Sequence, residues 1–218
     1  MSTLLLRFAA PLQSWGVESK FETRRTLGFP TKSGVIGLLA AALGYSRDDP
    51  LERFEGLRFG VRIDNEGELL RDYHTAKGKK DKDAYITYRY YLADACFLVG
   101  LECDDVAFLK ELEYALKHPV FSLYFGRRSC VPTLPLILRI TDESLLDALS
   151  REAWLLPEWK QKIVGDKILK IILDSDNSNF ASILRDVPMS FSQSHRKFAF
   201  RPIIEKEVYV EYDNFAGL

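Results

Sequence analysis

The segment LLLRFAAPLQSWG, residues 4–16, is followed after a short basic stretch by FPTKSGVIGLLAAALG, residues 29–44. The first segment begins within an apolar run over residues 3–8, which predicts a buried strand. The second predicts a helix that begins near Ser33 and ends at Gly44, because serine favours an N-cap and glycine follows many helix ends. Apolar residues surround the axis of this helix, so we expect it to be buried. Together, the strand and the helix predict the core of the fold.

Polar, basic and aromatic residues are expected to gather where this strand and this helix end. They are Gln13, Ser14, Trp15, Lys20, Arg24, Arg25 and Lys32. A helix N-terminus attracts anions, so the corner predicts a site for a polyanion. The stretch GFPTKS, residues 28–33, resembles half of a phosphate loop, but a Walker motif needs a glycine where Thr31 stands. The sequence therefore disfavours ATP or GTP binding at this corner.

Downstream of this corner, strand patterns alternate with helix patterns. Strands are expected at residues 57–63, 69–75, 85–102, 120–125, 134–140, 168–173 and 203–212, and helices at 104–116 and 142–149. Asp64-Asn65-Glu66-Gly67 predicts a hairpin turn between the first two of these strands. The charged stretch KGKKDKDA, residues 77–84, predicts the tip of a protruding hairpin. The order of elements predicts a single α+β domain over residues 1–218, with an open antiparallel sheet and helices on one face.

Composition limits the classes of function that the chain can serve. It has 218 residues and a net charge of −1 at pH 7, so any nucleic-acid site must be a local basic patch. Its three cysteines show no C-x-x-C spacing, which predicts reduced thiols in the cytosol and no structural zinc. No apolar run approaches the roughly 20 residues that a membrane span needs.

Basic residues gather in four places along the chain. The clusters are Lys20, Arg24, Arg25 and Lys32; Lys77, Lys79, Lys80 and Lys82 with Arg89; Arg127 and Arg128; and Arg196, Lys197 and Arg201. Aromatic residues lie among them, and cations for phosphates beside rings for bases suit single-stranded RNA. The alternative is that the charges are solvated and the rings belong to the core. The stretch GRRS, residues 126–129, favours binding, since a glycine turn exposes backbone N–H groups beside paired arginines.

Histidines leave a catalytic alternative open. His74 lies at the start of the expected protruding hairpin and His195 in the last basic cluster. Two histidines that converge could cleave RNA without a metal by acid–base exchange. Their spacing does not show that they converge, so a structural or binding role is preferred for each.

Six motifs together carry a family resemblance over nearly the whole chain. They are LLLRFAAPLQSWG at 4–16, FPTKSGVIGLLAAALG at 29–44, DYHT at 72–75, RYYLADACF at 89–97, GRRSC at 126–130 and RDVPMSF at 185–191. In these motifs the chain resembles the RAMP-superfamily subunits that bind the crRNA 5′ handle in type I-E CRISPR Cascade complexes.

The resemblance implies a ferredoxin-like (RRM-like) RAMP fold with a β-hairpin thumb at about residues 73–91 and a glycine loop at about residues 126–132. It implies a non-catalytic cytoplasmic subunit that grips the 5′ handle of the crRNA beside the Cascade backbone and large subunits, without a cofactor, a membrane or a small-molecule substrate. The RNA-facing residues that it implies are Gln13, Trp15, Arg24, Lys32, Ser33, His74, Arg89, Arg127 and Arg128. Arg196, from the last basic cluster, is a further candidate for RNA binding. A related subtype uses its equivalent subunit as the processing ribonuclease, with a tyrosine, a lysine and a histidine. A metal-independent endoribonuclease therefore stays the alternative.

Overall fold

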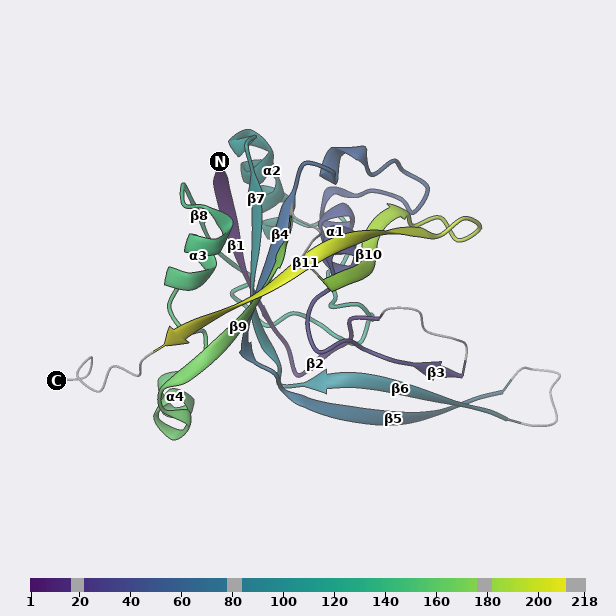
Figure 1. The fold of residues 1–218 in the computed structure, drawn as a ribbon. Coiled ribbons are helices and arrows are strands. Elements are labelled where there is room, and N and C mark those ends of the chain that lie inside the picture. The colour runs from purple at the N-terminus through teal and green to yellow at the C-terminus, as the bar shows by residue number, and fades with distance from the viewer. Residues whose placement is uncertain (17–21, 78–83, 176–181, 211–218) are drawn as a thin grey trace.

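Strand β1, Ser2–Ala9, lies inside the larger of two sheets. The computed structural model describes residues 1–16, 22–77, 84–175 and 182–210. The order of the seven strands is β10-β11-β9-β4-β7-β1-β8, and every pair is antiparallel (Figure 1). The other six strands are β4 Arg58–Asn65, β7 Cys96–Cys103, β8 Ile137–Thr141, β9 Lys167–Asp174, β10 Ser182–Ser190 and β11 Lys197–Val210. The α+β class and the antiparallel sheet predicted from the sequence are confirmed.

A smaller sheet extends from the end of the larger one. It contains β2 Leu12–Gln13, β3 Thr23–Arg24, β5 Glu68–Ala76 and β6 Tyr85–Ala93. Strands β5 and β6 form a long hairpin that projects away from the body of the protein (Figure 1). Strand β3 pairs with β6 in parallel, whereas β2 pairs with β6 antiparallel. The helical elements are α1 Lys32–Leu43, η1 Glu52–Phe54, α2 Val106–Lys117, α3 Leu145–Arg151 and α4 Glu158–Val164.

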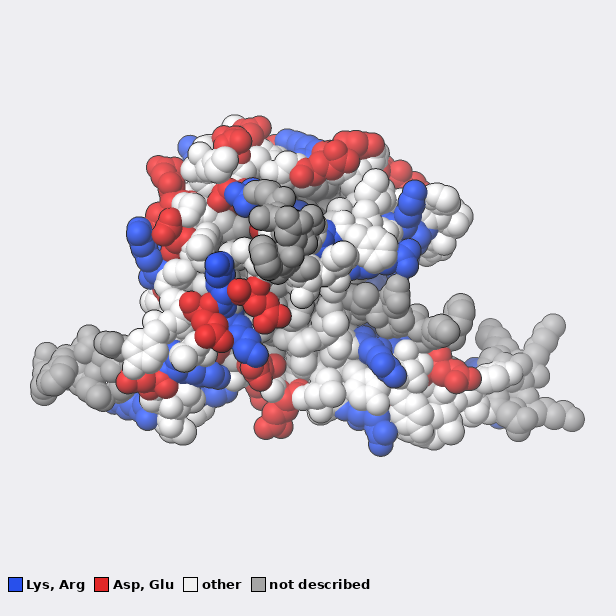
Figure 2. All heavy atoms as spheres, viewed as in Figure 1, with Lys and Arg blue, Asp and Glu red and all other residues white. Residues whose placement is uncertain are grey.

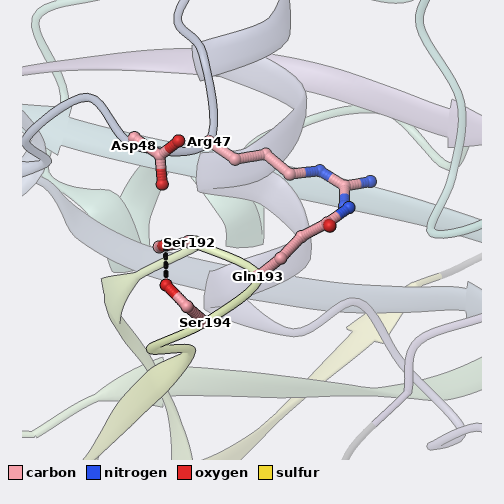
Figure 3. A pocket seen from close by; sticks show the side chains of 5 residues that line it. All are labelled: Arg47, Asp48, Ser192, Gln193 and Ser194. Atoms are coloured by element: carbon pink, nitrogen blue, oxygen red, sulfur yellow. Dashed lines mark hydrogen bonds between the residues drawn. The ribbon is translucent and has the colours of Figure 1, made fainter.

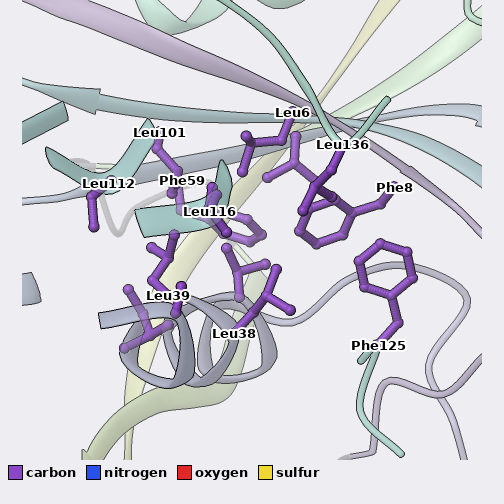
Figure 4. Packing of buried hydrophobic residues seen from close by; sticks show 14 of the residues in the cluster. Leu6, Phe8, Leu38, Leu39, Phe59, Leu101, Leu112, Leu116, Phe125 and Leu136 are labelled. Carbon is purple, nitrogen blue, oxygen red and sulfur yellow. The ribbon is translucent and has the colours of Figure 1, made fainter. Parts of the chain in front are cut away.

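Helices cover both faces of the larger sheet, which corrects the prediction of helices on one face. Leu4, Leu6 and Phe8 of β1 pack toward α1 and α2 in the main core (Figure 4). The alternate residue Leu5 is equally buried, with 0% exposure, and packs on the opposite face in a cluster to which α3 contributes Leu149. The physical reason is that β1 is apolar on both sides, so each side needs a cover.

The N-cap of helix α1 lies two residues before the predicted one. Thr31, not Ser33, is the N-cap, and its side chain accepts a hydrogen bond from the N–H of Gly34. Gly44 ends the helix with a φ of +85°, as predicted from the sequence. Six of the twelve residues are buried, which confirms that this helix belongs to the core. The described helices include none that is long and apolar enough to cross a membrane.

The chain changes sheets at residues 65–67 and 93–95, which we call the sheet junction. Asp64-Asn65-Glu66-Gly67 was predicted as a hairpin turn, but β4 pairs with β7 and β5 pairs with β6 instead. Gly67 has a φ of +71°, and a Cβ there would lie 2.3 Å from the carbonyl oxygen of Ala93. The predicted single strand 85–102 is likewise wrong, because Asp94, with a φ of 53°, separates β6 from β7. A sequence that is typical of a hairpin turn thus lies where the chain bends from one sheet into the other.

Other predicted boundaries also shift. Residues 120–125 do not form a strand; the N–H of Val120 donates to the carbonyl of Ala42 near the end of α1. The strand predicted at 134–140 is β8, Ile137–Thr141, and the strand predicted at 203–212 begins earlier, as β11. Strand β10 and helix α4 were not predicted, because β10 carries a proline and charges and α4 buries no residue.

Charged side chains of the sheet hold both ends of α3. Near its start, the carboxylate of Glu102 accepts the N–H of Leu145 at 2.6 Å. Near its end, the guanidinium of Arg62 donates to the carbonyl oxygens of Leu149, Glu152 and Ala153. Arg62 also donates to both carboxylate oxygens of Asp64, at 2.7 and 2.8 Å, and both side chains are 0% exposed. This ion pair therefore anchors the segment that follows α3.

We expect Asp64→Ala to lower the free energy of unfolding by about 3–5 kcal/mol, because it leaves the charge of Arg62 buried and unpaired. Urea denaturation of the purified protein measures this loss. Glu113→Ala is the control, since it breaks the half-exposed Lys117–Glu113 ion pair and should cost less than about 1 kcal/mol. Equal losses in the two variants would contradict the anchoring role.

Candidate nucleic-acid interface

The turn Gln13-Ser14-Trp15 lies in the core and not at the surface. Gln13 Nε2 donates to the carbonyls of Phe8 and Ala95, at 3.2 and 2.8 Å, and its Oε1 accepts Nε1 of Trp15 at 3.2 Å. The indole also packs against the rings of Phe8 and Phe125. Gln13 and Trp15 are 0% and 1% exposed, so the expectation that both face RNA is corrected. They position the neighbouring elements instead.

A carboxylate of the protein itself, that of Asp186, already occupies the N-terminus of α1. The N–H of Lys32 donates to Oδ2 of Asp186 at 2.7 Å, and Nζ of Lys32 pairs with Asp174 at 2.7 Å. Arg201 is 5% exposed and bonds to both of these carboxylates. The predicted anion-attracting corner therefore exists, but an internal network occupies it and Lys32 lies within that network. Ser33 lies in the first turn of α1, with its Oγ 3.4 Å from Oγ1 of Thr31.

Three arginines from separate segments meet on one face of β6, which we call the basic face. Arg24 of β3 is the register partner of Arg89 in β6. Arg127, in the loop before β8, donates from Nη2 to the carbonyl oxygen of Arg24 at 3.1 Å. Its guanidinium lies over the ring of Tyr91, 4.4 Å from the centroid. Segments that are far apart in the sequence thus bring their positive charges together.

Three polar atoms on this face are buried without a hydrogen-bond partner among the described residues. They are Oγ1 of Thr87, Nε of Arg89 and Nη1 of Arg127. Thr87, Arg89 and Tyr91 alternate along β6, so their side chains point to the same side. A buried donor that lacks an acceptor typically costs about 1–3 kcal/mol. The basic face therefore has unsatisfied hydrogen-bond donors among the described residues, and these suit a ligand rich in acceptor oxygens.

Asp72 and His74 of β5 lie on the same face. Asp72 is the cross-strand partner of Arg89, and His74 is the partner of Thr87. Nε2 of the His74 imidazole contacts the carboxylate of Asp72, and both side chains are partly exposed. His74 is thus placed beside the arginines, with its ring oriented by a carboxylate.

The opposite face of the β5–β6 hairpin is aromatic and apolar. Tyr73 and Tyr88 are cross-strand partners whose rings meet edge to face, with centroids 6.0 Å apart. Arg71 lies over the Tyr88 ring at 5.3 Å, and Leu69 is 65% exposed. The hairpin therefore presents two chemically different sides.

The glycine loop packs tightly on the buried turn. The N–H of Ser14 donates to the carbonyl oxygen of Phe125 at 3.2 Å, and the N–H of Cys130 donates to that of Arg127 at 2.8 Å. Neither Arg128 nor Ser129 donates a backbone hydrogen bond to a described residue. Arg128 is exposed at this loop, beside the basic face to which Arg127 belongs.

Arg196 lies apart from this group, in the exposed connection between β10 and β11. Figure 2 shows basic side chains over the right-hand part of these strands and acidic ones gathered at the top of the view. Sequence reasoning missed Thr87 and Tyr91. The alternation in YITYRYYLA, residues 85–93, could have placed both with Arg89, but the pairing of β3 with β6 leaves no sequence signal. Among the described residues, no group of three or more potential ligands could hold a metal ion.

Comparison with known proteins assigns the chain to a family. A family model described as CRISPR-associated protein (Cas_Cas5) matches residues 3–204. The chain belongs to this Cas5 family. A curated relative of the Cas5-family protein, "CRISPR system Cascade subunit CasD" of Escherichia coli (strain K12), is 42% identical over 160 residues, which are 63% of this chain and 70% of the relative.

Two solved structures are similar to the Cas5-family protein over most of its length. A chain of a structure titled "CRISPR RNA-guided surveillance complex" has a TM-score of 0.80 and 32% identity, and the match covers 96% of this chain and 91% of that one. A structure titled "Crystal structure of Cas protein" has a TM-score of 0.73 and 39% identity, with 94% of each chain covered.

Gly126→Ala tests the contact between the glycine loop and the buried turn. Gly126 has a φ of +80°, and a Cβ there would lie 1.7 Å from the carbonyl oxygen of Ser14. We expect the free energy of unfolding to fall by at least the roughly 1–3 kcal/mol of backbone strain. Gly56→Ala is the control, because its Cβ would meet nothing within 4 Å. A Gly126 variant as stable as the Gly56 variant in urea would contradict the contact.

Proposed function

We propose that this Cas5-family protein is the subunit of a type I-E Cascade surveillance complex that grips the 5′ handle of the crRNA without cleaving it. The observation that carries the proposal is the convergence of Arg24, Arg89 and Arg127 on one face of β6. Buried N–H groups of Arg89 and Arg127 there have no acceptor in the part of the chain that the structure describes. Phosphate oxygens of RNA would supply those acceptors through charge-assisted hydrogen bonds.

RNA has two kinds of chemical group, phosphates and bases, that complement the two faces of the β5–β6 hairpin. Phosphates would pair with the arginines of the basic face, and the exposed rings of Tyr73 and Tyr88 offer surfaces on which unstacked bases can stack. Arg128 and the N–H groups of the glycine loop would extend the phosphate contacts, and His74 would add a further donor. Lys32 and Ser33 would contribute indirectly, through the position of α1.

The topology supports a ferredoxin-like (RRM-like) RAMP domain. Elements β1, α1, β4, β7, α2 and β8 follow one another along the chain, and the strand order β8-β1-β7-β4 is the order expected for that fold. The β5–β6 hairpin is inserted between β4 and β7, where a thumb is expected. The partners that we propose are the crRNA and the neighbouring Cascade backbone and large subunits, in the cytoplasm. The names of the similar proteins support membership of such a complex.

The double variant Arg89→Met, Arg127→Met tests RNA binding. Methionine keeps the apolar stems of both side chains and removes both charges. We expect assembled complexes with this variant to lose guide RNA at lower salt than the wild type. The slope of log affinity against log salt should fall by about 0.7 for each lost phosphate contact.

Lys110→Met, Lys206→Met is the matched control, since both lysines are exposed and lie on α2 and β11. The isolated Arg89→Met protein should also be at least as stable as the wild type, because the change removes a buried donor without a partner. Wild-type guide occupancy across the whole salt titration in the arginine variant would sink the proposal.

The endoribonuclease alternative depends on the Asp72–His74 pair beside Arg89, because a carboxylate orients the imidazole. The other described histidines lie elsewhere, His118 at the end of α2 and His195 between β10 and β11. We expect labelled repeat RNA to stay intact with the purified protein in EDTA. Site-specific cleavage that disappears in His74→Ala would favour the nuclease instead.

A further inference from the structure

The outer end of the β10–β11 hairpin carries a second group of exposed positive charges. Arg185 lies on β10, Arg196 in the connection and Lys197 at the first position of β11, and all three are exposed. Arg185 lies over the ring of Phe200, 5.6 Å from the centroid, and that ring is 67% exposed. We call these four residues the distal basic group. None of them belongs to the basic face of β6.

The acidic residue of strand β10, Asp186, is turned inward. The register of β10 and β11 shifts between Leu184 and Val187, where Arg185 and Asp186 lie. Asp186 is 1% exposed and both of its oxygens bond to Arg201, whereas Arg185 is an exposed residue that donates from Nε to the carbonyl oxygen of Phe198. The irregular pairing thus separates the two signs of charge, and the described outer end of the hairpin is left positive.

A polar hollow adjoins the distal basic group. It has a volume of about 330 Å³ and is lined by Arg47, Asp48, Ser192, Gln193 and Ser194 (Figure 3). Arg47 and Gln193 both line it, and the hydroxyls of Ser192 and Ser194 are 3.1 Å apart. Asp48 contributes a carboxylate at the other end. The hollow therefore offers guanidinium, amide and hydroxyl donors for an anionic group, with Asp48 limiting how much negative charge it admits.

We propose that the distal basic group and the adjoining hollow bind the phosphodiester backbone of a nucleic-acid strand, as a second contact separate from the basic face. The inference rests on the proposed function, in which the protein works within a nucleic-acid complex. An exposed ring beside an arginine, with further cations and hydroxyls around it, matches the stacking and phosphate chemistry of single-strand binding. Figure 1 shows this hairpin and the β5–β6 hairpin extending toward the same side of the protein.

The variant Arg196→Ala, Lys197→Ala tests the contact in the assembled complex. Two measurements, or arms, distinguish guide RNA from target DNA as the bound strand. One arm is the retention of guide RNA in a salt titration, and the other is the affinity of the guide-loaded complex for target DNA. We expect one arm to weaken, with the salt slope reduced by about 1.4 for two lost contacts to a single strand. The arm that weakens identifies the strand. Arg47→Ala should weaken the same arm.

The control is Lys170→Ala, Lys206→Ala, which removes the same charge from exposed positions on β9 and β11. Wild-type behaviour of the distal variant in both arms would overturn the inference. Loss of a protein subunit with both nucleic-acid affinities unchanged would also overturn it, in favour of an acidic protein partner. The Arg89→Met, Arg127→Met variant, measured in parallel, tests the handle contact by itself, so the two proposals can fail separately.

Discussion

The side-chain amide of Gln13 joins the parts of the protein on which the basic face depends. It ties β1, through Phe8, to the sheet junction, through Ala95, and it accepts the indole N–H of Trp15. The turn that contains it also holds the glycine loop through Ser14. An amide is suited to this position because it donates and accepts at once and carries no charge that burial would penalise. The positions of Arg127 and of the strand that carries Arg89 therefore depend on one buried polar group.

The structure separates charges that work inside the protein from charges that are open to a ligand. Lys32 and Arg201 looked like ligand-binding residues in the sequence, yet they neutralise Asp174 and Asp186 at the start of α1. Arg89 and Arg127 have neighbours of their own, but each retains a buried nitrogen with no hydrogen-bond partner in residues 1–16, 22–77, 84–175 and 182–210. Buried nitrogens without partners lower the stability of the free chain, which is consistent with a surface that binds another molecule.

Local signals predicted local structure well. The buried helix ending at Gly44 and the strand β1 follow from apolar patterning and helix-end chemistry, which act over a few residues. The contact between Lys32 and Asp186 spans 154 residues, so no local pattern could show that the helix N-terminus is already occupied. The same limit explains why Asp64-Asn65-Glu66-Gly67 looked like a hairpin turn. The family motifs predict a region for a site, but burial determines which of its side chains can reach a ligand.

The sheet junction gives the β5–β6 hairpin a mechanical property. Both of its strands continue directly into the neighbouring strands β4 and β7 at the centre of the larger sheet, across residues 65–67 and 93–95. A hairpin joined to a surface loop could reorient about that loop, whereas both strands of this one are continuous with strands of the larger sheet, so any bending would occur at Gly67 and Asp94. Force on the β5–β6 hairpin would therefore be transmitted along the backbone to β4 and β7. Docking of the hairpin would therefore strain or brace the whole domain.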